Sequence, residues 1–376
     1  MTDPTIKLLQ DLVAIDSVNP SLVPGGAGES AVAERVAEWM RSWGLDVAVT
    51  DAAPGRPNVF GVIEGARGGK SLMLCGHSDT VGVEGMTAPF DPVIRDGKLF
   101  GRGAQDMKGG VAAILDAARK LAASPTGLKG RVIVAIVADE EYASIGAEAA
   151  VKDWTADAAI VAEPTDLAIG IGHKGFEWVE VETHGVAAHG SRPDDGVDAI
   201  VMMGRVLAGL ESLEQHFIAA APHPILGRAS VHASLVSGGR ELSTYPDRCK
   251  LSIERRTVTG EPPRSLLREV ADILDRLRAA DPRFRAEARF LFDRSPYLTP
   301  EKHPLPSILR DSLDRKTTTG ALSFWTDAAI IGGAGMASVI FGPGGAGLHG
   351  IEEYVRIDEV LACRDALVET ARRFCA

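Results

Sequence analysis

The first half of the chain alternates between two hydrophobic patterns. Residues 29–43 and 109–123 carry apolar side chains at helical spacing, which predicts two amphipathic helices. Gly44 follows the first of them and suits a helix C-terminal cap. Between and after the helices lie short runs rich in β-branched residues, which predict buried strands at 71–75, 131–138, 158–161 and 338–341. This alternation predicts βα units stacked on a largely parallel sheet.

The pattern changes near residue 175. Residues 176–183 alternate charged and apolar side chains, as expected for a sheet with one face in water. Further strands and helices of an α+β module are predicted at 197–210, 230–236, 249–256 and 266–277. From residue 296 the chain returns to helix, strand and glycine-rich loop. We therefore expect an α/β domain in two parts, 1–174 and 293–376, with a smaller α+β domain, 175–292, inserted between them.

Composition narrows the class of protein. At 376 residues the chain is too long for one ordinary core, and 45% hydrophobic residues with a mean hydropathy of +0.05 describe a soluble globular protein. The formal charge of -11 and the pI near 5.4 argue against nucleic acid or an anionic membrane as a partner, because both select basic surfaces.

Three further features indicate a cytoplasmic protein. The cysteines are irregularly spaced, which favours free thiols in a reducing compartment at positions 75, 249, 363 and 375. The first nine residues have polar and acidic interruptions where a signal peptide needs an unbroken apolar run. Residues 328–351 carry no charge, but eight glycines and Pro343 favour strand and loop over a membrane span.

One glycine motif suggests nucleotide binding. Gly170-Ile-Gly-His-Lys-Gly175 satisfies GxGxxG, but a dinucleotide site needs a helix directly after the glycines and an acidic residue about 20 positions later. The residues that follow predict a strand, so we interpret the glycines as a domain hinge.

Six imidazole and carboxylate side chains form a candidate set, and most of them lie where a predicted strand ends in a loop. They are His77, Asp106, Glu140, Glu141, Glu163 and His349. Ligands of open α/β sheets bind outside the carboxyl ends of the strands, so residues far apart in sequence can converge there. Imidazoles and carboxylates that meet in this way indicate a metal site.

Some members of the set also have a structural alternative. His77 can belong to a capped turn, Asp106 can cap a helix, and Glu140 can lie in a solvated acidic turn. Glycines on both sides of Asp106 favour a carboxylate that bridges two cations. Two adjacent glutamates allow Glu141 to act as a ligand and Glu140 as the general base that takes a proton from the attacking water. Asp79 is expected to fix the geometry by accepting a hydrogen bond.

Five motifs carry a family resemblance, and they stand in the order GHSDTV, GRGAQDMKGG, DEE, EPT and LHGIEEY from Gly76 onward. The chain resembles the family of acetylornithine deacetylase, succinyl-diaminopimelate desuccinylase, carboxypeptidase G and aminoacylase. The resemblance implies that His77, Asp106 and Glu163 bind one metal. It implies that Asp106, Glu141 and His349 bind the other, with Glu140 as the base and Asp79 beside His77.

The resemblance also implies an α/β catalytic domain of the zinc-peptidase type, with a mainly parallel sheet flanked by helices. The inserted domain would be a lid and dimerisation domain. By resemblance, His189 reaches the active site of the neighbouring subunit and stabilises the oxyanion, and Arg256 holds a substrate carboxylate. Ser243 stands where the family frequently has asparagine, which puts that substrate contact in doubt.

The sequence therefore predicts a dinuclear metal-dependent amidohydrolase that cleaves the amide bond of an N-acyl amino acid. Two divalent ions are expected, with zinc favoured and cobalt or manganese able to substitute. The alternative is a dipeptidase or carboxypeptidase that uses the same site on small peptides. A metal-dependent binding or scaffold protein is disfavoured by Glu140, since a binding site needs ligands but no base.

Overall fold

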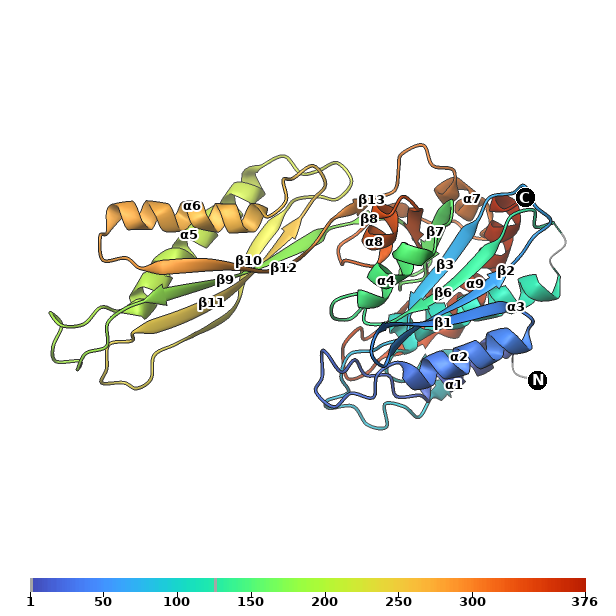
Figure 1. Cartoon of the computed structure of the whole chain (residues 1–376), viewed down its shortest axis with the longest axis horizontal. Helices are drawn as coiled ribbons and strands as arrows, with labels where there is room; N and C mark the ends of the chain where they lie inside the picture. Colours follow the sequence, from blue (N-terminus) through green and yellow to red (C-terminus); the bar gives the residue numbers. More distant parts are fainter. Residues whose placement is uncertain (1–2, 125–126) are drawn as a thin grey trace. The chain divides into compact units, whose positions relative to one another are not determined.

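The chain folds into two compact units in a computed structural model that describes residues 3–124 and 127–376 (Figure 1). The first unit comprises Met1–Gly172, Leu298–Ala321 and Thr326–Ala376, and the second comprises His173–Tyr297 and Leu322–Trp325. These limits lie within a few residues of the expected junctions, at 174 and 292, except that the short segment 322–325 joins the smaller unit.

A nine-stranded sheet forms the centre of the first unit within the described residues. Its order is β1-β2-β6-β3-β7-β15-β8-β13, and β14 pairs with β8. The strands are β1 (Asp46–Ala53), β2 (Arg56–Ile63), β3 (Leu72–His77), β6 (Val132–Val137), β7 (Ala158–Val161), β8 (Ile169–His173), β13 (Tyr297–Leu298), β14 (Thr319–Leu322) and β15 (Ala337–Ile340).

The central strands β6, β3, β7 and β15 are parallel. Every residue of these four strands is buried, which explains why their sequences are apolar except for His77 at the end of β3 and Ser338 in β15. Outside them, β2 runs antiparallel to β6, β1 antiparallel to β2, and β8 antiparallel to β15. The sheet is therefore mixed but mainly parallel at its centre, and the expected α/β fold class is confirmed.

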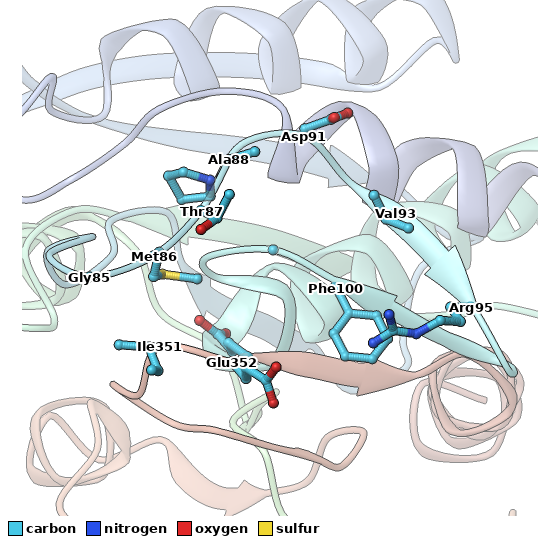
Figure 2. A pocket seen from close by; sticks show the side chains of 13 residues that line it. Gly85, Met86, Thr87, Ala88, Asp91, Val93, Arg95, Phe100, Ile351 and Glu352 are labelled. Atoms are coloured by element: carbon cyan, nitrogen blue, oxygen red, sulfur yellow. The ribbon is translucent and has the colours of Figure 1, made fainter.

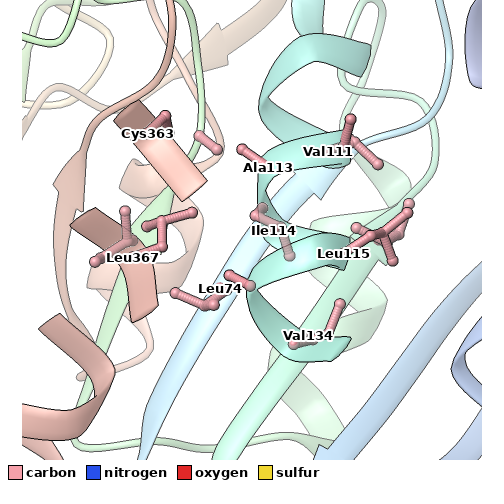
Figure 3. Packing of buried hydrophobic residues seen from close by; sticks show 14 of the residues in the cluster. Leu74, Val111, Ala113, Ile114, Leu115, Val134, Cys363 and Leu367 are labelled. Carbon is pink, nitrogen blue, oxygen red and sulfur yellow. The ribbon is translucent and has the colours of Figure 1, made fainter. Parts of the chain in front are cut away.

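Helices pack on this sheet through their apolar faces. Leu74 of β3 and Ile114 and Leu115 of α3 belong to one buried cluster with Leu367 of α9 (Figure 3). Burying each of these side chains contributes on the order of 2 kcal/mol. The helices of the unit are α1 (Pro4–Val13), α2 (Ser30–Ser42), α3 (Gly109–Ala123), α4 (Ile145–Asp153), α7 (Leu305–Asp311), α8 (Ala328–Gly333) and α9 (Ile357–Phe374).

A smaller sheet and a π-helical turn complete the first unit. The sheet has the order β16-β17-β5-β4. The π-helical turn η1 (Ala104–Lys108) leads directly into α3. The strands of the small sheet are β4 (Val93–Arg95), β5 (Lys98–Phe100), β16 (Gly345–Ala346) and β17 (Tyr354–Arg356).

The second unit is a four-stranded antiparallel sheet with two helices on one face (Figure 1). Its strand order is β10-β11-β9-β12, which leaves β10 and β12 at the edges. Val179, Leu251 and Ile253 point to the helices and are buried, while most of the alternate residues are polar or charged. The elements are β9 (Gly175–His184), β10 (Ser230–Gly238), β11 (Arg248–Thr257), β12 (Ala286–Arg294), α5 (Ala199–Ala219) and α6 (Ser265–Ala280).

The segment 328–351 differs in one respect from the expected strand and loop, because it begins with the short helix α8. Its apolar strand β15 is a buried member of the central sheet. Among the described residues, no helix has the length and apolar character needed to cross a membrane. All four cysteines are buried and none forms a disulfide.

The start of α3 approaches the end of β7 so closely that only glycine fits. A Cβ atom at Gly110 would lie 2.0 Å from the carbonyl oxygen of Ala162, which is a backbone atom and cannot swing away. We predict that Gly110→Ala lowers the free energy of unfolding by about 1–3 kcal/mol, as overpacking does elsewhere. Chemical denaturation of the purified protein measures this change.

Gly204 provides the matched control, since it lies in α5 and an added Cβ there meets no atom within 4 Å. Gly204→Ala should therefore stabilise the protein by about 0.5–1 kcal/mol, through the higher helix propensity of alanine. An unchanged or higher stability for Gly110→Ala would show that the two backbones can separate without cost.

Candidate metal centre

His77 is the last residue of β3, and its ring is fixed by its immediate surroundings. The side chain is fully buried, and Nδ1 lies 3.0 Å from the main-chain oxygen of Asp79. This contact directs Nε2 toward the carboxylates of three other segments. Nε2 lies 3.3 Å from Asp106, 3.9 Å from Glu163 and 4.0 Å from Glu140.

Asp106 lies in η1, and each of its carboxylate oxygens faces a different imidazole. Oδ1 lies 3.3 Å from Nε2 of His77, and Oδ2 lies 3.4 Å from Nε2 of His349. The side chain does not cap α3, whose N-cap residue is Lys108 and whose N-cap makes no side-chain hydrogen bond. The helix-cap alternative for Asp106 is therefore wrong. A carboxylate placed between two imidazoles has the geometry that a bridging ligand requires.

Two groups of three potential ligands result, and Asp106 belongs to both. His77, Asp106 and Glu163 form the first, and Asp106, Glu141 and His349 form the second. Within each group the ligand atoms lie within 4.8 Å of one another. In the second group, His349 Nε2 is 3.2 Å from a carboxylate oxygen of Glu141.

Two of these carboxylates carry a buried oxygen that lacks a hydrogen-bond partner among the described residues, namely Oε1 of Glu141 and Oε1 of Glu163. Leaving a buried acceptor unsatisfied is costly, and such groups are rare in folded proteins. Divalent cations between imidazole and carboxylate ligands would satisfy both oxygens. The residues present therefore fit two metal ions.

The pKa values of these side chains in the metal-free protein support the same conclusion. Burial raises the pKa values of Glu140 and Glu163 well above the usual range, and it raises that of Glu141 to about 7. Hydrogen bonds to Asp106 and Glu141 raise the pKa of His349 to about 10. Cations bound here would neutralise the carboxylates, and they would displace the proton of His349, since metal ligands must be deprotonated.

The turn after β6 separates its three acidic residues. Glu140 and Glu141 direct their main-chain N–H groups to the carboxylate of Asp79, at 3.1 and 3.2 Å. Asp139 has a positive φ of 69°, and its carboxylate instead accepts hydrogen bonds from Asn19 and Arg56. Of the three acids, therefore, only Glu140 and Glu141 face the ligand groups. The solvated-turn alternative for Glu140 is wrong, because this side chain is largely buried.

Glu353 supports Asp106 from the loop after His349. Its carboxylate accepts the main-chain N–H groups of Gly103, Gln105 and Asp106 at 2.8 to 3.0 Å, and it also pairs with Arg102 at 2.7 Å. In the sequence, Glu353 is marked only as one letter of the LHGIEEY motif. The signal that distinguishes Glu353 is its burial in the folded protein. The sequence of a glycine-rich loop does not show that an acidic residue in it is buried.

His189 and Arg256 both belong to the second unit. His189 is exposed, and its Nδ1 lies 2.8 Å from Oγ of Ser191. Arg256 lies on β11, where its Nε donates to Glu254 at 2.7 Å and its guanidinium lies over the ring of Phe176. Ser243 is exposed and accepts a hydrogen bond from the N–H of Gly190 through its main-chain oxygen.

A separate cavity of about 370 Å³ lies beside the loop that follows His349. Figure 2 shows Ile351 and Glu352 on one side of it and Phe100 with Arg95 on another. The guanidinium of Arg95 lies 4.6 Å from the centre of the Phe100 ring. No member of the two ligand groups lines this cavity, so it is distinct from the candidate metal centre.

Comparison with known proteins decides the family. Residues 73–373 match the model of the peptidase family M20/M25/M40. The chain belongs to this family. The M20/M25/M40 match includes all five sequence motifs, and it confirms the family resemblance and the expected class of hydrolase.

Relatives of the M20/M25/M40 protein include an acetylornithine deacetylase from Myxococcus xanthus, 30% identical over 335 residues that span 86% of each chain. An N-formyl-4-amino-5-aminomethyl-2-methylpyrimidine deformylase from Bacillus subtilis is 27% identical and covers 94% of this chain and 91% of its own. Among solved structures, a tripeptidase from Staphylococcus aureus has a TM-score of 0.82 at 20% identity, covering 99% and 98% of the two chains. A dinuclear metal binding peptidase from Bacillus subtilis has a TM-score of 0.75 at 16% identity, covering 98% and 97%.

Proposed function

We propose that the protein is a dinuclear metal-dependent amidohydrolase that cleaves the amide bond of an N-acyl amino acid. The observation that carries this proposal is the pair of ligand groups that share Asp106, with Glu140 beside them. Ligands alone would suit a binding protein. The additional buried carboxylate of Glu140, which belongs to neither group, is what hydrolysis needs.

His77, Asp106 and Glu163 would hold one cation, and Asp106, Glu141 and His349 would hold the other. Imidazole with carboxylate favours Zn²⁺, and Co²⁺ or Mn²⁺ suit the same donors. When bound, the cations supply Lewis-acid chemistry, because they acidify a water molecule and polarise a substrate carbonyl. The main-chain oxygen of Asp79 accepts from Nδ1 of His77, which leaves Nε2 as the nitrogen for the metal.

Glu140 would move the proton. It takes a proton from water as the water oxygen bonds to the amide carbon, and it delivers this proton to the nitrogen as the C–N bond breaks. Its position is set by the bond from its own N–H to Asp79 and by the buried strand β6 before it. The raised pKa of Glu140 in the protein alone, due to burial, is consistent with a group that must both accept and release a proton.

The inserted unit would select the substrate. Arg256 presents a guanidinium that is held by Glu254 and Phe176, and a planar fork of this kind suits a substrate carboxylate. His189, with Nδ1 engaged by Ser191, would use Nε2 to stabilise the oxyanion in the active site of a second subunit. At position 243 the substrate would meet the hydroxyl group of Ser243 instead of the side-chain amide of an asparagine.

The acyl substrate is favoured over a peptide by the relatives of similar length. These are named as deacetylases of acetylornithine and a deformylase, and both names describe removal of a small acyl group from nitrogen. The tripeptidase and the dinuclear peptidase share the fold at lower identity. A dipeptidase or carboxypeptidase activity is therefore the alternative.

The free buried cysteines support a cytoplasmic location.

A homodimer through the inserted unit is supported by an exposed apolar edge. β10 is an edge strand on which Leu235 and Val236 are 72% and 61% exposed. The neighbouring helix α5 adds Val201, which is 61% exposed. An apolar edge strand left open is a template for pairing with another chain. A second copy of the same strand would cover it.

Glu140→Gln should retain both metal ions, but its kcat should fall by about 10²–10⁴-fold, because the side-chain amide of glutamine cannot take a proton from water. Metal analysis and steady-state kinetics on an N-acetyl amino acid measure the two effects. The control is Glu84→Gln, an exposed glutamate in the loop after Val83, which should behave as wild type. Wild-type turnover by Glu140→Gln would contradict the assignment of the base.

Removal of divalent cations with a chelator should abolish hydrolysis, and added Zn²⁺ or Co²⁺ should restore it. The assay compares an N-acetyl amino acid, an N-succinyl amino acid and a dipeptide that release the same product. Faster turnover of the acyl substrates supports the deacylase, and faster turnover of the dipeptide supports the alternative. Full activity after verified removal of the metals would overturn both.

Replacing Leu235 and Val236 together by lysine should convert the dimer to a monomer, because charges on the edge strand oppose pairing. Sedimentation velocity measures the change, and activity should fall with it if His189 acts across the dimer. Leu291→Lys, on the opposite edge strand β12 and 39% exposed, should leave the dimer intact. A wild-type protein that is monomeric and fully active would refute this arrangement.

A further inference from the structure

A buried network of polar side chains is bonded to the turn that carries Glu140 and Glu141. Its members come from four separate segments of the first unit, and all are less than 8% exposed: Asn19, Glu29, Arg56, Asp79 and Asp139. None of them belongs to the two ligand groups. Because charged groups are rarely buried without a specific partner, the network requires an explanation.

Asn19 joins the two carboxylates that hold this turn. Its Nδ2 donates to Oδ2 of Asp79 at 2.8 Å and to Oδ1 of Asp139 at 3.0 Å. Asp79 in turn accepts the main-chain N–H groups of Glu140 and Glu141. Asp139 precedes these two residues in the chain. One amide group therefore fixes the turn from both sides.

Arg56 sets the orientation of that amide. Its Nη2 donates to Oδ1 of Asn19 at 3.2 Å and to Oδ1 of Asp139 at 2.9 Å, while Nε donates to Glu29 at 2.6 Å. With Oδ1 turned toward the guanidinium, Nδ2 of Asn19 must point toward the carboxylates. A flipped amide would place N–H groups against the guanidinium and oxygen against two acids, so only one orientation satisfies the network.

Arg56 is the cation that pairs with two carboxylates of the network. Asp79, Asp139 and Glu29 are buried carboxylates, and Arg56 forms ion pairs with Glu29 and Asp139. Without the guanidinium, acids would be left buried and unpaired beside the turn. Asp79 and Asp139 would then move apart, and the N–H groups of Glu140 and Glu141 would lose their fixed acceptor.

We propose that Asn19 and Arg56 are positioning residues, which act through Asp79 and Asp139 to hold Glu140 and Glu141 in place. The inference rests on the proposed function, since it assigns the turn to catalysis and metal binding. Glu141 belongs to the ligand group that includes His349, so disorder of the turn should weaken that group in particular. Side chains outside the first coordination sphere commonly affect metal affinity or activity by about 10- to 100-fold.

The test compares Asn19→Ala and Arg56→Met with Arg364→Met. Arg364 is the matched control because it is 7% exposed, as is Arg56, and pairs with Asp3 and Asp116 away from the network. Each full-length variant is measured for thermal stability, for binding of Zn²⁺ by calorimetry after chelation, and for kcat and KM on the best N-acyl substrate. Asn19→Ala removes no charge, so it carries the test if Arg56→Met does not fold.

We expect Asn19→Ala and Arg56→Met to weaken one of the two Zn²⁺ sites by about 10- to 100-fold and to lower kcat with little change in KM. Arg364→Met should lose thermal stability but keep both Zn²⁺ affinities and kcat. Unchanged metal affinity and kcat in Asn19→Ala, or equal losses in Arg364→Met, would overturn the inference. A wild-type protein that binds no metal and cleaves no amide would instead refute the proposed function itself.

Discussion

Four carboxylates share one largely buried space, and holding them together is the constraint on which the rest of the structure depends. Asp106, Glu140, Glu141 and Glu163 come from three segments and would repel one another if all were ionised. Two imidazoles lie between them, and two oxygens remain without hydrogen-bond partners among the described residues. The protein therefore supplies most of the coordination and leaves the compensating charge to cations.

The fold meets this constraint by fixing the backbone of each acid. The buried parallel strands β3, β6 and β7 end beside one another, which delivers His77 and the acidic turns to a common edge of the sheet. Two further carboxylates then hold the loops by accepting main-chain N–H groups. Asp79 holds the turn of Glu140, and Glu353 holds η1 around Asp106. Acids outside the two ligand groups thus keep the candidate ligands in position.

The sequence predicted the parts of the fold that have a clear period or an unbroken apolar run. The helix expected at 109–123 is α3 with the same limits, and the four predicted buried strands all exist. The candidate ligands were found because strand ends and glycine-rich motifs mark them. Asn19, Arg56 and Glu353 were missed, because nothing in the sequence distinguishes a buried polar residue from an exposed one. Only the tertiary fold shows that Arg56 and Glu353 form buried ion pairs and that Asn19 is hydrogen-bonded between buried carboxylates.

Asp106 makes the two ligand groups a single structural unit. Because one carboxylate serves both, a displacement of η1 changes both groups, whereas a displacement of His349 changes one directly. The loop after His349 is nevertheless connected to both, since Glu353 accepts the N–H of Asp106 while His349 faces the second oxygen of the same carboxylate.

His77 is fully buried and His349 is 56% exposed, so the second group is the one open to solvent. The loop of residues 349–353 thus combines the exposed imidazole with the support of the shared ligand. This explains why the last motif of the chain is needed to complete a site that the first four motifs begin.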